Sequence, residues 1–66
     1  MKEIIQLLEI ETGETWYFYN VAVMLATIRN THEGRPISLK NLVVYNGAIA
    51  IYTIKPVYII EQPDHL

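Results

Sequence analysis

The dipeptide Asn46-Gly47, set between two runs of apolar residues, is the local signal that most constrains the fold. Asn-Gly in this setting is typical of a two-residue type I′ turn between antiparallel strands. Such a turn would pair Tyr45 with Ala48 and continue outward along both strands. Both faces of the resulting hairpin are largely apolar, whereas a sheet with one solvated face alternates apolar and polar residues. The hairpin therefore predicts a β structure with one face in its own core and the other against a neighbouring subunit.

Further segments rich in Ile, Val, Tyr and Thr complete a five-stranded antiparallel arrangement. Gly13 marks a turn after the first strand, because glycine readily takes a positive φ. Pro56 lacks the N–H that a strand ladder uses, so we expect it to interrupt the fourth strand. The expected strands are residues 3–11, a second strand from residue 15, and residues 37–45, 48–54 and 57–60. The predicted fold class is all-β: a small, strongly bent antiparallel sheet or barrel.

The segment at residues 20–31 admits two interpretations. As a helix it would be capped by Asn20, and its apolar face would consist of Val21, Met24, Leu25 and Ile28. As a strand it would continue the extended run before it, which its β-branched residues favour. Periodicity alone does not separate short apolar runs. We favour one long, bent strand, and the alternative is an α+β fold with a helix at 20–31.

The chain is one domain, residues 1–66, with a polar tail at 62–66. A domain of this size buries only about 60% of the surface that its unfolded chain exposes, so it usually needs an additional stabilising device. The sequence has no cysteine and no His/Asp/Glu cluster for a structural metal, and we expect no cofactor. Oligomerisation remains, so we expect a homo-oligomer. The predicted oligomer interface consists of Leu42, Val44, Ile49, Ile51, Val57 and Ile59.

The net charge of −2, with five basic residues, provides no general attraction for phosphate. A nucleic-acid partner would require several basic side chains gathered on one face. The longest uncharged runs, residues 15–28 and 41–54, are shorter than the roughly 20 residues of a membrane-spanning helix. We therefore expect a cytoplasmic protein that does not associate with membranes.

The residues needed for catalysis are few. Ser38 is the only serine, cysteine is absent, and His32 and His65 lie in a polar loop and in the tail. We predict no catalytic residue and no enzymatic activity. The five tyrosines could stack on nucleic-acid bases, but few basic residues accompany them, so we interpret them as core and interface residues.

The polar loop that follows residue 28 is the most plausible binding segment, because exposed loops often carry function. Guanidinium, amide and imidazole groups in this loop can all present hydrogen bonds to a base or a carboxylate. The candidate binding residues here are Arg29, Asn30, His32 and Arg35.

Read as five strands, the chain resembles the small Sm-like β-barrels, particularly the short forms encoded by tailed phages. The stretches that carry the resemblance are Ile10-Glu11-Thr12-Gly13-Glu14, Ile37-Ser38-Leu39-Lys40-Asn41 and Ile54-Lys55-Pro56-Val57-Tyr58-Ile59-Ile60. The resemblance implies an Sm/SH3-like fold whose strands pair between subunits to close a ring. It also implies binding of single-stranded RNA through the loops after the second and fourth strands. Lys55 matches the second of these loops and joins the candidate binding residues.

Three functions follow from these observations. The first is a non-catalytic, self-associating domain that binds a partner, with single-stranded RNA in an Sm-like ring as one form. The alternative is a protein–protein inhibitor or accessory factor of a phage or mobile element, with a host protein as its partner. A DNA-binding regulator would require residues 20–31 to be helical, and the negative charge disfavours it.

Overall fold

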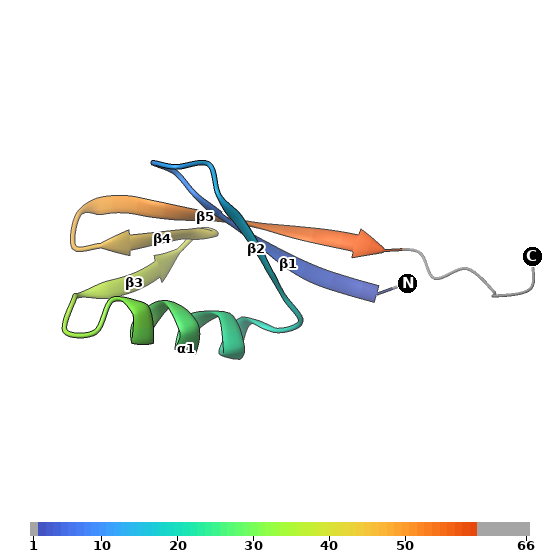
Figure 1. The fold of residues 1–66 in the computed structure, drawn as a ribbon, viewed down its shortest axis with the longest axis horizontal. Coiled ribbons are helices and arrows are strands. Elements are labelled where there is room, and N and C mark those ends of the chain that lie inside the picture. The colour runs from blue at the N-terminus through green and yellow to red at the C-terminus, as the bar shows by residue number, and fades with distance from the viewer. Residues whose placement is uncertain (1, 60–66) are drawn as a thin grey trace, which may run out of the picture.

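In the computed structural model, which describes residues 2–59, one antiparallel sheet carries one helix on one of its faces (Figure 1). The elements are β1 (Lys2–Glu9), β2 (Thr15–Phe18), α1 (Val21–Thr31), β3 (Ile37–Lys40), β4 (Val43–Asn46) and β5 (Ile49–Ile59). The strand order across the sheet is β2-β1-β5-β4-β3. The predicted five-stranded antiparallel sheet is confirmed, whereas the boundaries of several strands differ from the prediction.

Residues 21–31 form a helix, so the favoured strand is wrong and the helix alternative is confirmed. Asn20 caps the helix: its backbone is extended, and its side-chain oxygen accepts a hydrogen bond of 2.8 Å from the Val23 N–H. Met24 and Ile28 lie one turn apart and are both buried. The burial of this helical face outweighs the β preference of the branched residues, because tertiary packing routinely overrides propensity.

The hydrophobic core lies between α1 and the sheet. Alternate residues of each strand face the helix, because successive side chains of a strand point to opposite sides. Met24, Ile28 and Val44 are almost completely buried. The other buried core residues are Ile5, Leu7, Tyr52 and Ile54, and Phe18, Leu25, Ile37 and Ile51 pack against them in part.

The region predicted as one hairpin contains two tight turns, one between β3 and β4 and one between β4 and β5. Asn41 and Leu42 both have positive φ, at 51° and 62°, and connect β3 to β4. Positive φ at both central residues is the requirement of a type I′ turn, so that turn lies here. At the second turn only Gly47 has a positive φ, and Tyr45 pairs with Ala50 instead of Ala48. The single strand expected over 37–45 is therefore two strands.

β5 continues through Pro56, and the predicted interruption there is wrong. The Ile54 N–H donates a hydrogen bond of 2.8 Å to the Leu42 carbonyl. The Ile54 N–H therefore points toward β4. Because alternate residues direct their N–H groups to the same side, the Pro56 nitrogen points to that side as well. The register of β4 against β5 ends at Val43 and Thr53, so no ladder bond is lost at Pro56.

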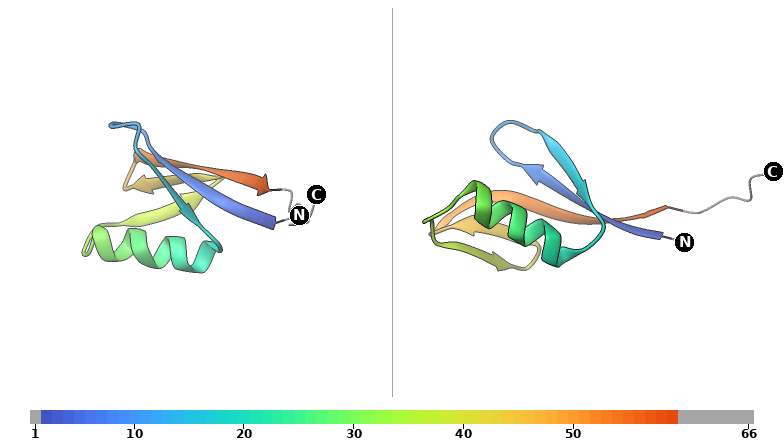
Figure 2. Two further views of the ribbon diagram at one scale, coloured as in Figure 1. Left: turned by 45° about the vertical axis from the view of Figure 1, so that its right-hand side comes forward. Right: turned by 60° about the horizontal axis from the view of Figure 1, so that its bottom comes forward.

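β1 and β5 form the longest strand pair, from Lys2 opposite Ile59 to Glu9 opposite Tyr52. β2 pairs with β1 only as far as Ile5, so the two long strands extend together beyond the rest of the sheet (Figure 2). Within residues 2–59, β2 and β3 each pair with one neighbour and form the two edges of the sheet. No helix in this part of the chain is long and apolar enough to cross a membrane.

Candidate functional site

Tyr52, on the helix-facing side of β5, connects the sheet to the end of α1. Its hydroxyl lies 2.9 Å from Nε2 of His32, and the two rings meet edge to face at 72°. The ring of Trp16 makes a second edge contact with Tyr52, with 6.2 Å between the ring centroids. Burial, and secondarily the negative charge of Glu9, raise the pKa of Tyr52 above its ordinary value of 10.0. Tyr52 is therefore a neutral phenol at pH 7.

His32 is fixed from its backbone as well as from its ring. It follows the last residue of α1, and its N–H donates to the Ile28 carbonyl at 2.9 Å. The Arg35 N–H in turn donates to the His32 carbonyl at 3.0 Å. These bonds hold the start of the loop, and the hydrogen bond to Tyr52 turns the imidazole inward. Nε2 is therefore engaged within the protein.

A groove of about 130 Å³ runs between β2 and α1. Its lining residues are Leu7, Trp16, Phe18, Thr27, Ile28, Thr31 and Tyr52. The two threonine hydroxyls both donate to helix carbonyls at 2.9 Å: Thr27 to Val23, and Thr31 to Thr27. The groove therefore presents mainly apolar surface, which suits an apolar side chain of a partner.

A second hollow, of about 290 Å³, has His32 in its wall. Glu9 and Glu11 are part of its wall, and an Oε atom of Glu9 accepts a hydrogen bond of 2.6 Å from the Thr12 hydroxyl. Within residues 2–59, no three metal-ligating side chains gather at one point. The hollow contains two carboxylates and an imidazole, of which Glu9 and His32 are already hydrogen-bonded within the protein.

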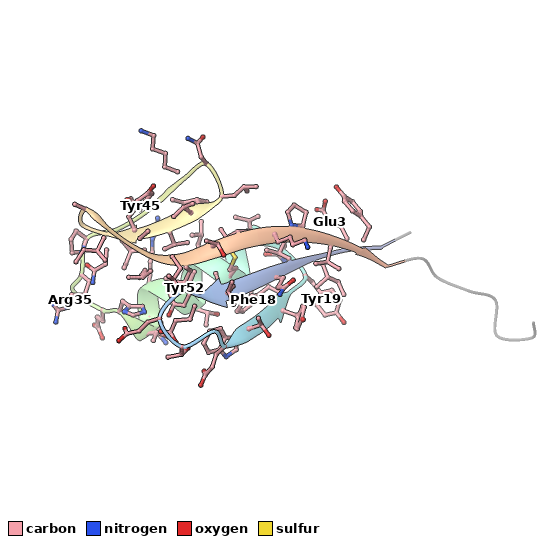
Figure 3. All side chains as sticks on the ribbon, turned by 90° about the horizontal axis from the view of Figure 1, so that it is seen from above. Glu3, Phe18, Tyr19, Arg35, Tyr45 and Tyr52 are labelled. Atoms are coloured by element: carbon pink, nitrogen blue, oxygen red, sulfur yellow. The ribbon has the colours of Figure 1, made fainter. Side chains whose placement is uncertain are left out.

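The sheet face opposite α1 carries no helix, and we call it the open face (Figure 3). Its residues follow from alternation, because their neighbours along each strand face the core. The open face includes Gln6 and Leu8 on β1, Tyr17 on β2, Lys40 on β3, Val43 and Tyr45 on β4, and Thr53 and Lys55 on β5. It combines a half-buried apolar centre with polar, aromatic and cationic side chains.

The open face differs in charge from the rest of the described chain. Lys40 and Lys55 lie on it, one on β3 and one on β5. Glu3 and Glu9 occupy the opposite parity on β1. The remaining described carboxylates are in connections: Glu11 and Glu14 between β1 and β2, and Glu33 before β3. The open face therefore carries positive charge in a protein of net charge −2.

The predicted binding residues separate into two groups. Arg29 and Asn30 are exposed in the last turn of α1, and Arg35 is exposed in the following loop, at the opposite end of the molecule from Tyr19 (Figure 3). His32 lies between them in the chain, with its ring turned toward Tyr52. Lys55 is not part of this group, because it projects from the open face.

The predicted interface residues do not form one surface. Val44 is fully buried in the core of the single chain and has no surface for a partner, so its assignment to the interface is wrong. Leu42 and Ile49 are exposed, whereas Ile51 packs partly against the core. Val57 is half-buried on the side of β5 that Lys55 occupies. The side chain of Ile59 and the tail at 62–66 lie outside the described residues.

The sequence interpretation assigned the five tyrosines to the core and the interface instead of to a binding surface. Tyr52 is a core residue, as expected, but Tyr17 and Tyr58 are 61% and 60% exposed. Tyr45 is half-buried on the open face. A signal was available in β4, where Tyr45 and Val43 alternate with the buried Val44. The neighbours of Tyr45 on that face depend on the register of β4 against β5, which was predicted incorrectly.

Comparison of the chain with protein-family models, with curated proteins and with solved structures finds no match.

Proposed function

We propose that this protein is a non-catalytic, cytoplasmic binding domain that assembles with copies of itself, as Sm-like proteins do. The observation that carries the proposal is the pair of free sheet edges, β2 on one side and β3 on the other. An unpaired strand edge is a template for another strand. Contact between β3 of one copy and β2 of the next is head-to-tail, and such contacts close into rings when the rotation per subunit permits.

The free edge of β3 offers a specific backbone group for this contact. The Pro36 carbonyl accepts a hydrogen bond of 2.9 Å from the Gly47 N–H, so it points toward the β4–β5 turn. The direction of the backbone N–H and C=O groups alternates along a strand. The backbone groups of Ser38 and Lys40 therefore also point toward β4, whereas those of Leu39 point outward, away from the sheet. Leu39 therefore presents the N–H that a neighbouring β2 would use.

The lack of a catalytic role is supported by the positions of the few suitable residues. Ser38 lies on the open face of β3, whereas His32 lies on the helix side with its ring bound to Tyr52. The sheet separates these two side chains, so they do not form a nucleophile–base pair.

The experiment is the absolute mass in solution, measured by light scattering on a sizing column over a range of concentrations. We expect a discrete oligomer whose mass does not change with dilution through the micromolar range. A monomer at every concentration would overturn the proposal.

Leu39→Pro tests the edge itself, because proline removes an N–H that no bond within residues 2–59 uses. We expect this variant to keep the circular dichroism spectrum of the wild type and to elute as a monomer. Leu39→Ala is the matched control: it also shortens the side chain, but it keeps the N–H, and it should remain an oligomer. If both variants behave alike, the edge contact is excluded.

The groove between β2 and α1 favours a second candidate, a protein–protein inhibitor or accessory factor. Its apolar lining would accept one apolar side chain of a target protein, and Trp16 at its rim is the kind of residue that dominates such contacts. Trp16→Ala should abolish capture of a stoichiometric partner. Retention of the partner by this variant would rule out the groove.

A further inference from the structure

The open face has the charge of a surface that binds an anion. Lys40 and Lys55 lie on it, and no described carboxylate shares it. The two lysines lie in different rows: Lys55 is opposite Gln6, and Lys40 is opposite Val43. A second copy of this chain packed face to face would bring the same cations against each other. The complementary occupant is therefore a chain with distributed negative charge.

The same face offers flat rings to that occupant. Tyr17 on β2 is 61% exposed, and Tyr45 on β4 is half-buried. The two strands are separated by β1 and β5, so about 14 Å lies between them across the sheet. Stacking of bases on aromatic side chains is a general way of holding single-stranded nucleic acid, and it tolerates any base sequence.

Polar groups lie between the two rings. Gln6 pairs with Tyr17 on one side and with Lys55 on the other, so an aromatic ring, an amide and an ammonium form one row across three strands. Thr53 lies in the next row, between Leu8 and Val43. Amide and hydroxyl groups both donate and accept hydrogen bonds, as base edges require.

We propose that the open face binds single-stranded nucleic acid, with bases stacked on Tyr17 and Tyr45 and phosphates near Lys40 and Lys55. This inference deepens the binding role proposed above and rests on it. It assigns the contact to the sheet, whereas the sequence interpretation assigned it to the loop residues around Arg29 and Arg35 together with Lys55, of which only Lys55 lies on the open face.

The experiment is a fluorescence anisotropy titration of the full chain with labelled ten-nucleotide oligouridine RNA and oligothymidine DNA at low salt. We expect Tyr17→Leu to weaken binding about tenfold, because leucine keeps apolar bulk but has no flat ring. Tyr58→Leu, an exposed tyrosine on the other face, is the matched control and should bind as the wild type does. Tighter binding of RNA than of DNA, or equal binding of both, agrees with the proposal.

The charges are tested by salt dependence. Lys40→Gln with Lys55→Gln should reduce the slope of log affinity against log salt by roughly 1.4, about 0.7 for each phosphate contact. Arg35→Gln should leave the slope unchanged. No binding by the wild type at low salt would overturn the proposal, and so would equal competition by polyglutamate. A smaller salt slope in Arg35→Gln, with an unchanged slope in the double lysine variant, would overturn the proposal as well.

Light scattering on the same samples separates the two proposals. Binding by a monomer would overturn self-association and leave the open face as the site. A discrete oligomer that binds neither oligonucleotide would overturn the inference about the open face and leave self-association in place.

Discussion

Leu42 holds a left-handed backbone conformation, with φ at 62° and its side chain 53% exposed. For residues other than glycine this conformation is strained by roughly 1–2 kcal/mol. We predict that Leu42→Gly raises the free energy of unfolding by about 1 kcal/mol and the melting temperature by about 4–8 °C. Thermal unfolding followed by circular dichroism measures the change.

Lys40→Gly is the matched control for Leu42→Gly, because it lies two residues away in β3, where φ is negative. There glycine only adds freedom to the unfolded chain, so this variant should melt below the wild type. If Leu42→Gly also melts lower, the turn is not strained at Leu42, and the side chain contributes more than its exposure indicates.

The raised pKa of Tyr52 predicts how the free energy of unfolding changes at alkaline pH. Its pKa is raised above 10.0 in the folded protein, so folding favours the neutral phenol. The resulting stabilisation is complete below pH 10, where the unfolded chain also keeps the proton, and it is lost as the pH rises through the higher, folded-state pKa. We expect the free energy of unfolding, measured in urea, to fall as the pH rises above 10, the ordinary tyrosine pKa.

Tyr52→Phe should reduce this alkaline fall, because phenylalanine carries no proton to lose. At pH 7 the same variant should be less stable by about 1 kcal/mol, since its hydrogen bond to His32 is gone. An unchanged fall in Tyr52→Phe would mean that another group dominates.

At the scale of elements, α1 depends on its cap. Asn20 satisfies the Val23 N–H, one of the first N–H groups that have no partner within a helix. Asn20→Ala should lower the free energy of unfolding by about 1 kcal/mol. Urea denaturation, followed by the circular dichroism signal of the helix, measures the loss.

Asn30→Ala is the control for Asn20→Ala. Asn30 is exposed in the last turn of the same helix, and alanine is the better helix former there, so its stability should stay equal or rise slightly. If Asn20→Ala unfolds at the same urea concentration as the wild type, water satisfies the Val23 N–H as well as Asn20 does, and the cap does not stabilise the fold.

The turns show how far local sequence determines the elements. Gly13 and Gly47 both take the positive φ that their turns require, as expected. The type I′ turn at Asn41 and Leu42 was not expected, because leucine rarely adopts that conformation. The same turn forces Val43 to start a new strand. A local strand preference extends through residue 42, and only the paired sheet shows where it stops.

The helix and the open face depend on contacts that are distant in sequence. Met24 and Ile28 have helical spacing, but their β-branched neighbours favour a strand, and only the sheet supplies the surface that the helix covers. Tyr17 and Lys55 lie in one row only because β1 pairs with both β2 and β5. The residue types of the site were visible in the sequence, whereas their common face was not.

At the scale of the whole molecule, stability depends on a small core. A domain of this length is stable by roughly 3–10 kcal/mol. Met24 is completely buried between α1 and the sheet, so Met24→Ala should cost about 2–5 kcal/mol. We expect this variant to be largely unfolded at 37 °C (about 310 K) in a scanning calorimeter, because its remaining stability is marginal.

Val23→Ala is the matched change on the exposed side of α1. Val23 is 52% exposed, so truncation there removes little buried surface and should leave the melting temperature close to that of the wild type. Equal melting temperatures for the two variants would show that α1 contributes little to the core.

The first and last strands of the described chain form the centre of the sheet, with Lys2 opposite Ile59. During synthesis, β1 leaves the ribosome before β5, its longer partner. Until β5 emerges, the nascent chain has only the short β1–β2 hairpin, α1 and the β3–β4 hairpin, none of which has a complete core. Formation of the complete sheet must therefore wait until β5 has emerged from the ribosome.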